Sequence, residues 1–140
     1  MGSGFLGDNA YGWTYGSNGK KYHDDAVATG VAYGDSYTNG DAIGVAFDAD
    51  NGVLTFYKNG VSQGAISNAL SSNETYFPFG WDGSGSLYSI FVTNFGQDSS
   101  FAGNKTAQGN QDSNDIGDFY YEPPTGFLAS VSYTHLTLPT

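Results

Sequence analysis

The sequence predicts an all-β domain of antiparallel strands, and three observations lead to this prediction. Glycine and aromatic residues are abundant, with 21 Gly, 11 Tyr and 10 Phe among 140 residues, a composition typical of aromatic strands joined by tight turns. Large apolar residues alternate along 43–47 and again along 53–58, which is the period of a strand with one buried face. No stretch shows a sustained helical period of apolar residues.

Two turns divide the central part of the chain, residues 40–60. The polar stretch Asp-Ala-Asp-Asn-Gly ends in Gly52, which tolerates the positive φ that such a turn needs. Asn59-Gly60 is the strongest short signal for a two-residue type I′ hairpin, because both central positions need φ > 0. We therefore expect a continuous antiparallel meander with strands at 41–48, at 53–58 and from Val61 onward.

The alternation also predicts which side chains this meander buries. On the large-residue face we expect Phe47, Leu54 and Phe56 to be core residues. The remaining pattern is weaker. It predicts strands at 11–15, 76–81 and 88–95, weak pairing within 27–33, and polar loops at 20–25, 34–39 and 63–74.

Five short motifs in this order resemble the SPRY (B30.2/SPRY) domain family, over about residues 12–96. The motifs are Gly12-Trp13-Thr14-Tyr15, Gly19-Lys20-Lys21-Tyr22-His23, the central Gly40-Asp41-x-Ile43-Gly44 with Asp48 and Leu54-x-Phe56-Tyr57-Lys58-Asn59-Gly60, then Tyr76-Phe77-Pro78, and the closing Val92-Thr93-Asn94-Phe95-Gly96. The resemblance implies an antiparallel SPRY-type (concanavalin-like) β-sandwich. It also implies a role in binding partners through loops rather than in catalysis.

The sequence predicts three regions. Residues 1–96 are expected to form a partial SPRY domain, because the aromatic strand that usually precedes these motifs has no counterpart and the N-terminal strands are missing. Residues 97–129 form a Gly/Asn-rich tail with a Pro-Pro aromatic segment, which resembles a segment that follows SPRY domains in phage-like proteins. Residues 130–140 resemble a translated sequencing adapter, so we treat them as an artefact on a metagenomic fragment.

The charge of the chain disfavours several classes of partner. Fourteen acidic residues oppose four lysines, with a net charge of −10. Nucleic acid and anionic membrane surfaces are both disfavoured, because binding to either depends on Lys and Arg. No apolar run is long enough to cross a bilayer. Cysteine is absent, so there is no disulfide framework.

The sequence gives little support for catalysis or for a cofactor. His23 is the one histidine before the adapter-like end, and a loop histidine explains it better than a catalytic base. The carboxylates Asp48 and Asp50 flank a turn, where Asp commonly bonds its own backbone. The same stretch imitates the start of a calcium loop, but Lys58 occupies the position of the closing Glu. We expect no enzyme activity, no cofactor and no metal.

The candidate ligand-binding residues are the aromatic and acidic side chains of two predicted loops: Tyr33, Asp35, Tyr37, Trp81 and Asp82. Exposed Tyr and Trp beside polar groups are typical of binding surfaces. The alternative is that Tyr33 and Trp81 are core residues. The predicted function is a non-catalytic module that binds a protein, a peptide or a glycan, within a phage or microbial structural protein and hence associated with a virion. The alternative is a carbohydrate-active enzyme or lectin on a similar sandwich.

Overall fold

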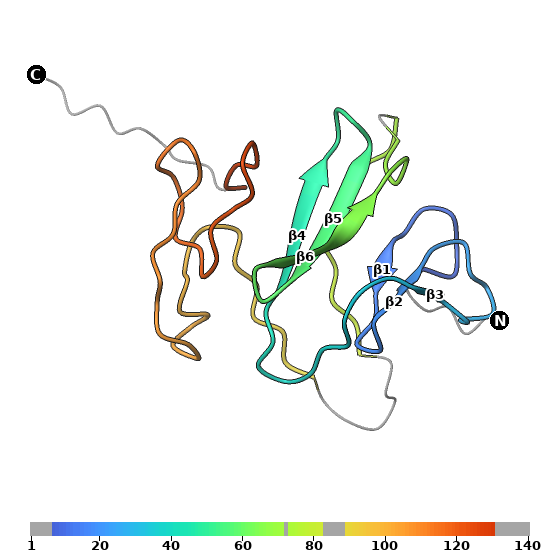
Figure 1. Ribbon diagram of the computed structural model, residues 1–140, viewed down its shortest axis with the longest axis horizontal. Coiled ribbons are helices and arrows are strands. Elements are labelled where there is room, and N and C mark those ends of the chain that lie inside the picture. Colours follow the sequence, from blue (N-terminus) through green and yellow to red (C-terminus); the bar gives the residue numbers. More distant parts are fainter. Residues whose placement is uncertain (1–6, 72, 83–88, 131–140) are drawn as a thin grey trace, which may run out of the picture. The chain divides into compact units, whose positions relative to one another are not determined.

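The computed structural model describes residues 7–71, 73–82 and 89–130, and these contain β-strands but no helix. The strands are β1 (Thr14–Tyr15), β2 (Lys20–Tyr22), β3 (Val31–Ala32), β4 (Ile43–Asp48), β5 (Val53–Lys58) and β6 (Val61–Ile66). They form two three-stranded antiparallel sheets in the orders β1-β2-β3 and β4-β5-β6 (Figure 1). No helix in the described ranges is long and apolar enough to span a lipid bilayer.

The chain divides into two compact units, Met1–Phe91 and Val92–Thr140, and the strands belong to the first. The second unit is held by turns in which side chains bond the backbone. The Asn94 side-chain oxygen accepts hydrogen bonds from the backbone N–H groups of Gly96 and Gln97, at 2.8 and 2.9 Å. The buried Asp112 carboxylate accepts the N–H groups of Ile116 and Ala129. Of the adapter-like residues 130–140, all but Ser130 lie outside the described residues.

The central meander is confirmed. β4 pairs with β5 from Ile43↔Lys58 to Asp48↔Val53, and β5 pairs with β6 from Lys58↔Val61. Asn59 and Gly60 have φ of 50° and 81°, as the two-residue turn requires. Each strand of this meander pairs with the next strand in the sequence, so the residues of the strands and of the turns between them specify the pairing.

The core of the first unit lies between the two sheets. Its buried apolar side chains are Tyr15, Leu54, Phe56, Ile66 and Ala69. The Tyr15 ring from β1 meets the Phe56 ring from β5, with centroids 5.5 Å apart. The two sheets therefore pack through aromatic side chains, and the all-β, sandwich-like prediction is confirmed.

The prediction that Phe47 is buried is wrong. Leu54 and Phe56 are only 6% and 8% exposed, whereas Phe47 is 43% exposed. Phe47 faces the same side as its cross-strand partner Leu54. However, β4 is at the edge of its sheet, and the rings of Tyr15 and Tyr33 contact Phe56 on β5. The ring of Phe47 instead contacts Tyr76, with centroids 5.6 Å apart.

Several weaker strand predictions also need correction. The predicted polar loop at 20–25 contains β2, the loop at 63–74 contains the end of β6, and only the ends of 11–15 and 27–33 form strands. The described residues of 76–81 and 88–95 contain no strand. At 76–81, Pro78 has no N–H to donate to a ladder. In both stretches the alternation of side chains led to the prediction, but alternation does not show whether a neighbouring strand is present to pair with.

Truncation of Phe56 tests this assignment of the core. Phe56→Ala should lower the free energy of unfolding by about 3–5 kcal/mol, the usual cost of emptying a buried Phe site. Phe47→Ala is the matched control, because the half-exposed ring should cost only about 1 kcal/mol. Urea denaturation measures both. Equal losses for the two variants would contradict the edge position of β4.

Candidate functional site

Three tyrosines connect the two sheets of the first unit, and we call them the tyrosine cluster: Tyr15 on β1, with Tyr33 and Tyr37 in the loop after β3. The ring of Tyr15 lies 5.4 Å from that of Tyr33 and 5.1 Å from that of Tyr37, measured between centroids. The Tyr37 hydroxyl donates to the backbone carbonyl of Tyr15 at 2.7 Å. The loop is thus attached to β1 through its side chains.

The Tyr33 hydroxyl fills an irregularity in the second sheet. The pairing of β5 with β6 shifts register between Thr55 and Tyr57, which leaves the N–H of Phe56 without a partner strand. That N–H donates to the Tyr33 hydroxyl at 3.1 Å, and the hydroxyl in turn donates to the carbonyl of Gly64. One side chain therefore satisfies two backbone groups at the bulge, the N–H of Phe56 and the C=O of Gly64.

Gln63, from the same irregular stretch, fixes the loop on its other side. Its side-chain oxygen accepts the N–H of Asp35 at 2.7 Å and lies 3.4 Å from the Tyr15 hydroxyl, which donates to the Asp35 carbonyl. A Cβ on Gly34 would lie 2.5 Å from that side-chain oxygen and 2.9 Å from the Cβ of Gln63, so the close approach requires glycine. The backbone at Asp35 is held firmly, while its carboxylate is exposed.

This packing favours the neutral form of all three tyrosines. Burial raises the pKa of Tyr15, and the nearby Asp35 carboxylate raises it further. Burial also raises the pKa of Tyr37 and of Tyr33. The hydrogen bond from Phe56 partly offsets the effect at Tyr33.

The structure brings Tyr33, Asp35 and Tyr37 together, but mainly to hold the fold. Tyr33 and Tyr37 pack against the core, and both hydroxyls bond the backbone. Their role in ligand binding stays a prediction. The bulge that uses Tyr33 could not be predicted from the sequence, because Gln63 and Gly64 look like ordinary loop residues there.

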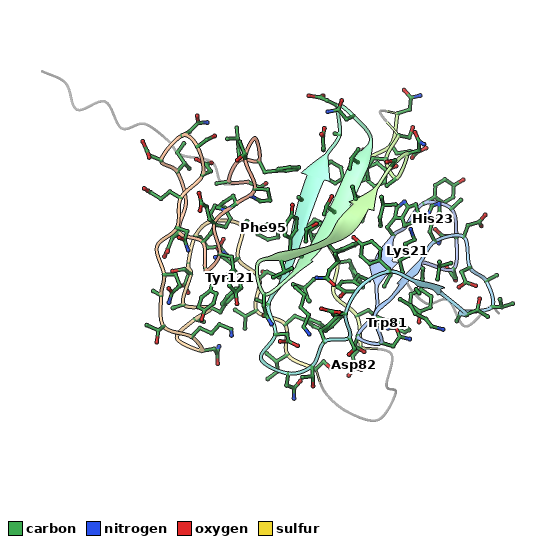
Figure 2. The ribbon with its side chains drawn as sticks, viewed as in Figure 1. Lys21, His23, Trp81, Asp82, Phe95 and Tyr121 are labelled. Carbon is green, nitrogen blue, oxygen red and sulfur yellow. The ribbon has the colours of Figure 1, made fainter. Side chains whose placement is uncertain are left out.

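The other two predicted residues, Trp81 and Asp82, come from a different stretch of the chain. We call residues 76–82 the aromatic segment. Phe77, Phe79 and Trp81 alternate along it and are 78%, 70% and 47% exposed. Figure 2 marks Trp81 and Asp82 at its end. Phe91, also exposed, packs on it, because a Cβ at Gly80 would lie 3.2 Å from the Phe91 ring. The alternation of side chains predicts a strand at Phe77 and Phe79, and neither residue is among the predicted site residues.

Trp13 and His23 form a second aromatic feature beside the core. Their rings stack in parallel with centroids 3.9 Å apart, and the Trp13 indole N–H donates to the Ala69 carbonyl at 2.8 Å. Lys21, labelled with His23 in Figure 2, has its Nζ 5.9 Å from the Trp13 ring centroid and 5.5 Å from that of Tyr33. The stacked pair therefore stabilises β1 and β2.

The family profile of the SPRY domain matches residues 1–102. The chain belongs to the SPRY domain family. It is similar to the ATP-dependent RNA helicase DDX1 of Xenopus laevis, with 37% identity over 74 residues, 51% of this chain and 10% of the helicase. It is also similar to the probable ATP-dependent RNA helicase ddx1 of Dictyostelium discoideum, with 30% identity over 73 residues, 52% of this chain and 9% of the helicase. The chain thus matches about a tenth of each relative's length.

SPRY domains are generally protein-interaction modules without catalytic activity. In this SPRY domain the side chains of the lysines in the first unit interact with other groups of the same chain. Lys20 Nζ donates to the Thr29 carbonyl at 2.8 Å, and Lys58 Nζ donates to the Ser36 carbonyl at 2.7 Å and lies 3.9 Å from Asp41. Lys21 lies over aromatic rings. Residues 1–91 carry nine acidic residues against these three lysines, so the surface is acidic.

The carboxylate of Asp48 has a structural role in this SPRY domain. It accepts the backbone N–H of Asn51 at 3.0 Å and the side-chain amide of Asn51 at 2.8 Å. Bonds to Asn51 lower the pKa of Asp48, so it is charged at neutral pH. Within the described ranges no three His, Cys, Asp or Glu side chains gather as metal ligands would.

Removal of the Tyr33 hydroxyl tests its role in the bulge. Tyr33→Phe leaves the Phe56 N–H and the Gly64 carbonyl without their protein partner, so it should lower the free energy of unfolding by about 1–3 kcal/mol. Tyr37→Phe is the matched control and should cost about 1 kcal/mol, because it releases a single carbonyl. A smaller loss for Tyr33→Phe than for Tyr37→Phe would contradict the bridge.

The tyrosine cluster also predicts a loss of stability at alkaline pH. The folded-state pKa values of Tyr15, Tyr33 and Tyr37 are raised, so above about pH 10 the unfolded chain loses protons that the folded chain keeps. Stability should be constant up to that pH and then fall as it rises further. Urea midpoints across this range measure the effect, and in Tyr37→Phe the fall should be less steep. A flat profile would contradict burial of the three hydroxyls.

Proposed function

We propose that this SPRY domain recognises a basic protein segment with apolar side chains, and that the aromatic segment is its main contact surface. The observation that carries the proposal is the exposure of Phe77, Phe79 and Trp81 in one extended stretch. Clustered exposed aromatic side chains are unusual on a surface without a partner, and they dominate the energy of many protein interfaces.

The charge of the first unit supports a basic partner. Its lysines are bonded to carbonyls or lie over aromatic rings, whereas Asp24, Asp35, Asp50 and Glu74 have exposed side chains. Asp82 adds a carboxylate directly beside Trp81. A partner with Lys or Arg near apolar side chains would match both properties, since opposite charge speeds encounter and excludes acidic competitors.

We also propose that the module serves a larger protein, as the small matched share of the two helicases suggests. On this proposal the chain shares a partner-binding part with them and not their ATP-dependent activity. The sequence-based proposal of a phage or microbial structural protein, and hence of virion association, is tested by the longer reading frame. Flanking tail or capsid genes would support it.

Selection from a random peptide display library on the immobilised chain tests the proposed function. The enriched peptides should combine Lys or Arg with apolar residues. A selected peptide should bind the double variant Phe77→Ser/Phe79→Ser at least tenfold more weakly, because each lost aromatic contact at an interface removes on the order of 1 kcal/mol or more. Isothermal titration calorimetry measures this loss, and added salt should weaken binding further.

Val61→Ser on β6 is the matched control, because it replaces another exposed apolar side chain and should leave binding unchanged. Unaltered binding by the double variant would contradict the aromatic segment as the contact surface. If the library yields no binding peptide and the chain binds glycans in a separate assay, the lectin alternative is favoured instead. Micromolar binding of duplex DNA at physiological salt would contradict the charge argument, because the chain has few Lys side chains to displace the counterions of DNA.

A further inference from the structure

Strand β4 lies at the edge of its sheet. The order is β4-β5-β6, so within the described residues β4 has a paired strand on one side only. Such an edge presents a row of backbone donors and acceptors to any extended chain that approaches it.

The register shows which groups of β4 face outward. The N–H of Asn59 donates to the carbonyl of Ala42 at 2.8 Å, and the β4–β5 pairing continues in the same register through Ile43↔Lys58. Hydrogen-bonded and non-hydrogen-bonded pairs alternate in an antiparallel ladder. Gly44 and Ala46 therefore bond β5, whereas the N–H and C=O groups of Ile43, Val45 and Phe47 point away from it.

The side chains at this edge are apolar and accessible. Val45 is 55% exposed and Phe47 is also exposed. The strand sequence Ile-Gly-Val-Ala-Phe-Asp contains no Lys and no Pro, although natural edge strands often use these residues to prevent pairing. The contact of Phe47 with Tyr76 places the start of the aromatic segment beside the same edge.

We infer that β4 binds the partner by strand addition: an extended segment, apolar at alternate positions and basic at its ends, pairs with Ile43, Val45 and Phe47. This inference rests on the proposed function and adds the mode of binding. Carboxylates lie at both ends of the edge, with Asp41 before β4 and Asp48 and Asp50 after Phe47. Lys58, 3.9 Å from Asp41, balances part of the charge at the first end, so Asp48 and Asp50 form the more acidic end. These carboxylates favour basic ends on the added strand.

The same charges disfavour a second copy of this chain as the occupant. Two β4 strands paired antiparallel about Val45 would place Asp48 of one copy across from Ala42 of the other, one residue from Asp41, so carboxylates of both copies would gather at each end and repel. A basic segment has no such cost. The six residues of β4 span about 20 Å at the usual rise of a strand, so a heptapeptide covers the edge.

Amide hydrogen exchange of the full chain, measured by NMR, tests the inference. The probe is the capped heptapeptide Lys-Val-Lys-Phe-Lys-Val-Lys, and the matched peptide with Glu in place of Lys is the control. In the free protein the amides of Val45 and Phe47 should exchange faster than those of Gly44 and Ala46. At a basic peptide concentration ten times its Kd, exchange at Val45 and Phe47 should slow by about tenfold, because only the unbound fraction exchanges.

Two changes test the backbone contact itself. Val45→Pro removes an outward N–H, which an edge strand tolerates, and should weaken binding of the basic peptide at least tenfold, whereas Val45→Thr keeps the N–H and should bind normally. If Val45→Pro lowers the thermal midpoint of the protein, weaker binding could reflect unfolding, so the peptide backbone is changed in place of the protein. N-methylation at one set of alternate residues should abolish binding, and methylation at the other set should not.

The outcomes separate this inference from the proposed function. Peptide binding that requires Phe77 and Phe79 but leaves exchange at Val45 and Phe47 unchanged would overturn strand addition and keep the proposed function. If the selection enriches no peptide that binds the chain, the proposed function itself is overturned. Protection of Val45 and Phe47 that rises with protein concentration alone would show self-pairing and overturn the inference.

Discussion

The hydroxyl of Tyr33 is the contact on which the first unit depends. It accepts the N–H of Phe56 and donates to the carbonyl of Gly64, so it replaces the ladder bonds that the bulge in β5–β6 removes. Without it, two backbone groups at the edge of the core would lack a protein partner. Because Tyr33 follows β3 directly, the same bond also joins the first sheet to the second.

This arrangement limits where a partner can bind. The aromatic side chains of the 33–37 loop pack against the core and bond the backbone, so a partner there would find mainly the exposed carboxylate of Asp35. The accessible aromatic area lies in the aromatic segment instead. Two of the predicted binding residues therefore stabilise the loop, while exposed neighbours of Trp81 offer the larger contact surface.

The sequence predicted what adjacent residues decide. Asn59-Gly60 specifies its own turn, and the two strands beside it take their register from that turn. Burial of Phe47 and pairing of residues 76–81 depend on which strand lies alongside, and alternation carries no information about that neighbour. The function of Tyr33 depends on backbone groups 23 and 31 residues further along the chain, so no local pattern could indicate it.

The edge and the aromatic segment are connected through one pair of rings. Phe47 is exposed because β4 ends the sheet, and its ring lies 5.6 Å from that of Tyr76, where the aromatic segment begins. A strand added to β4 would cover Phe47 and leave its next residues close to Tyr76. Backbone pairing would then supply affinity that is independent of sequence, and the aromatic side chains would supply selectivity. A partner that binds only the folded module also stabilises it by mass action, so binding and folding of this module favour the same arrangement.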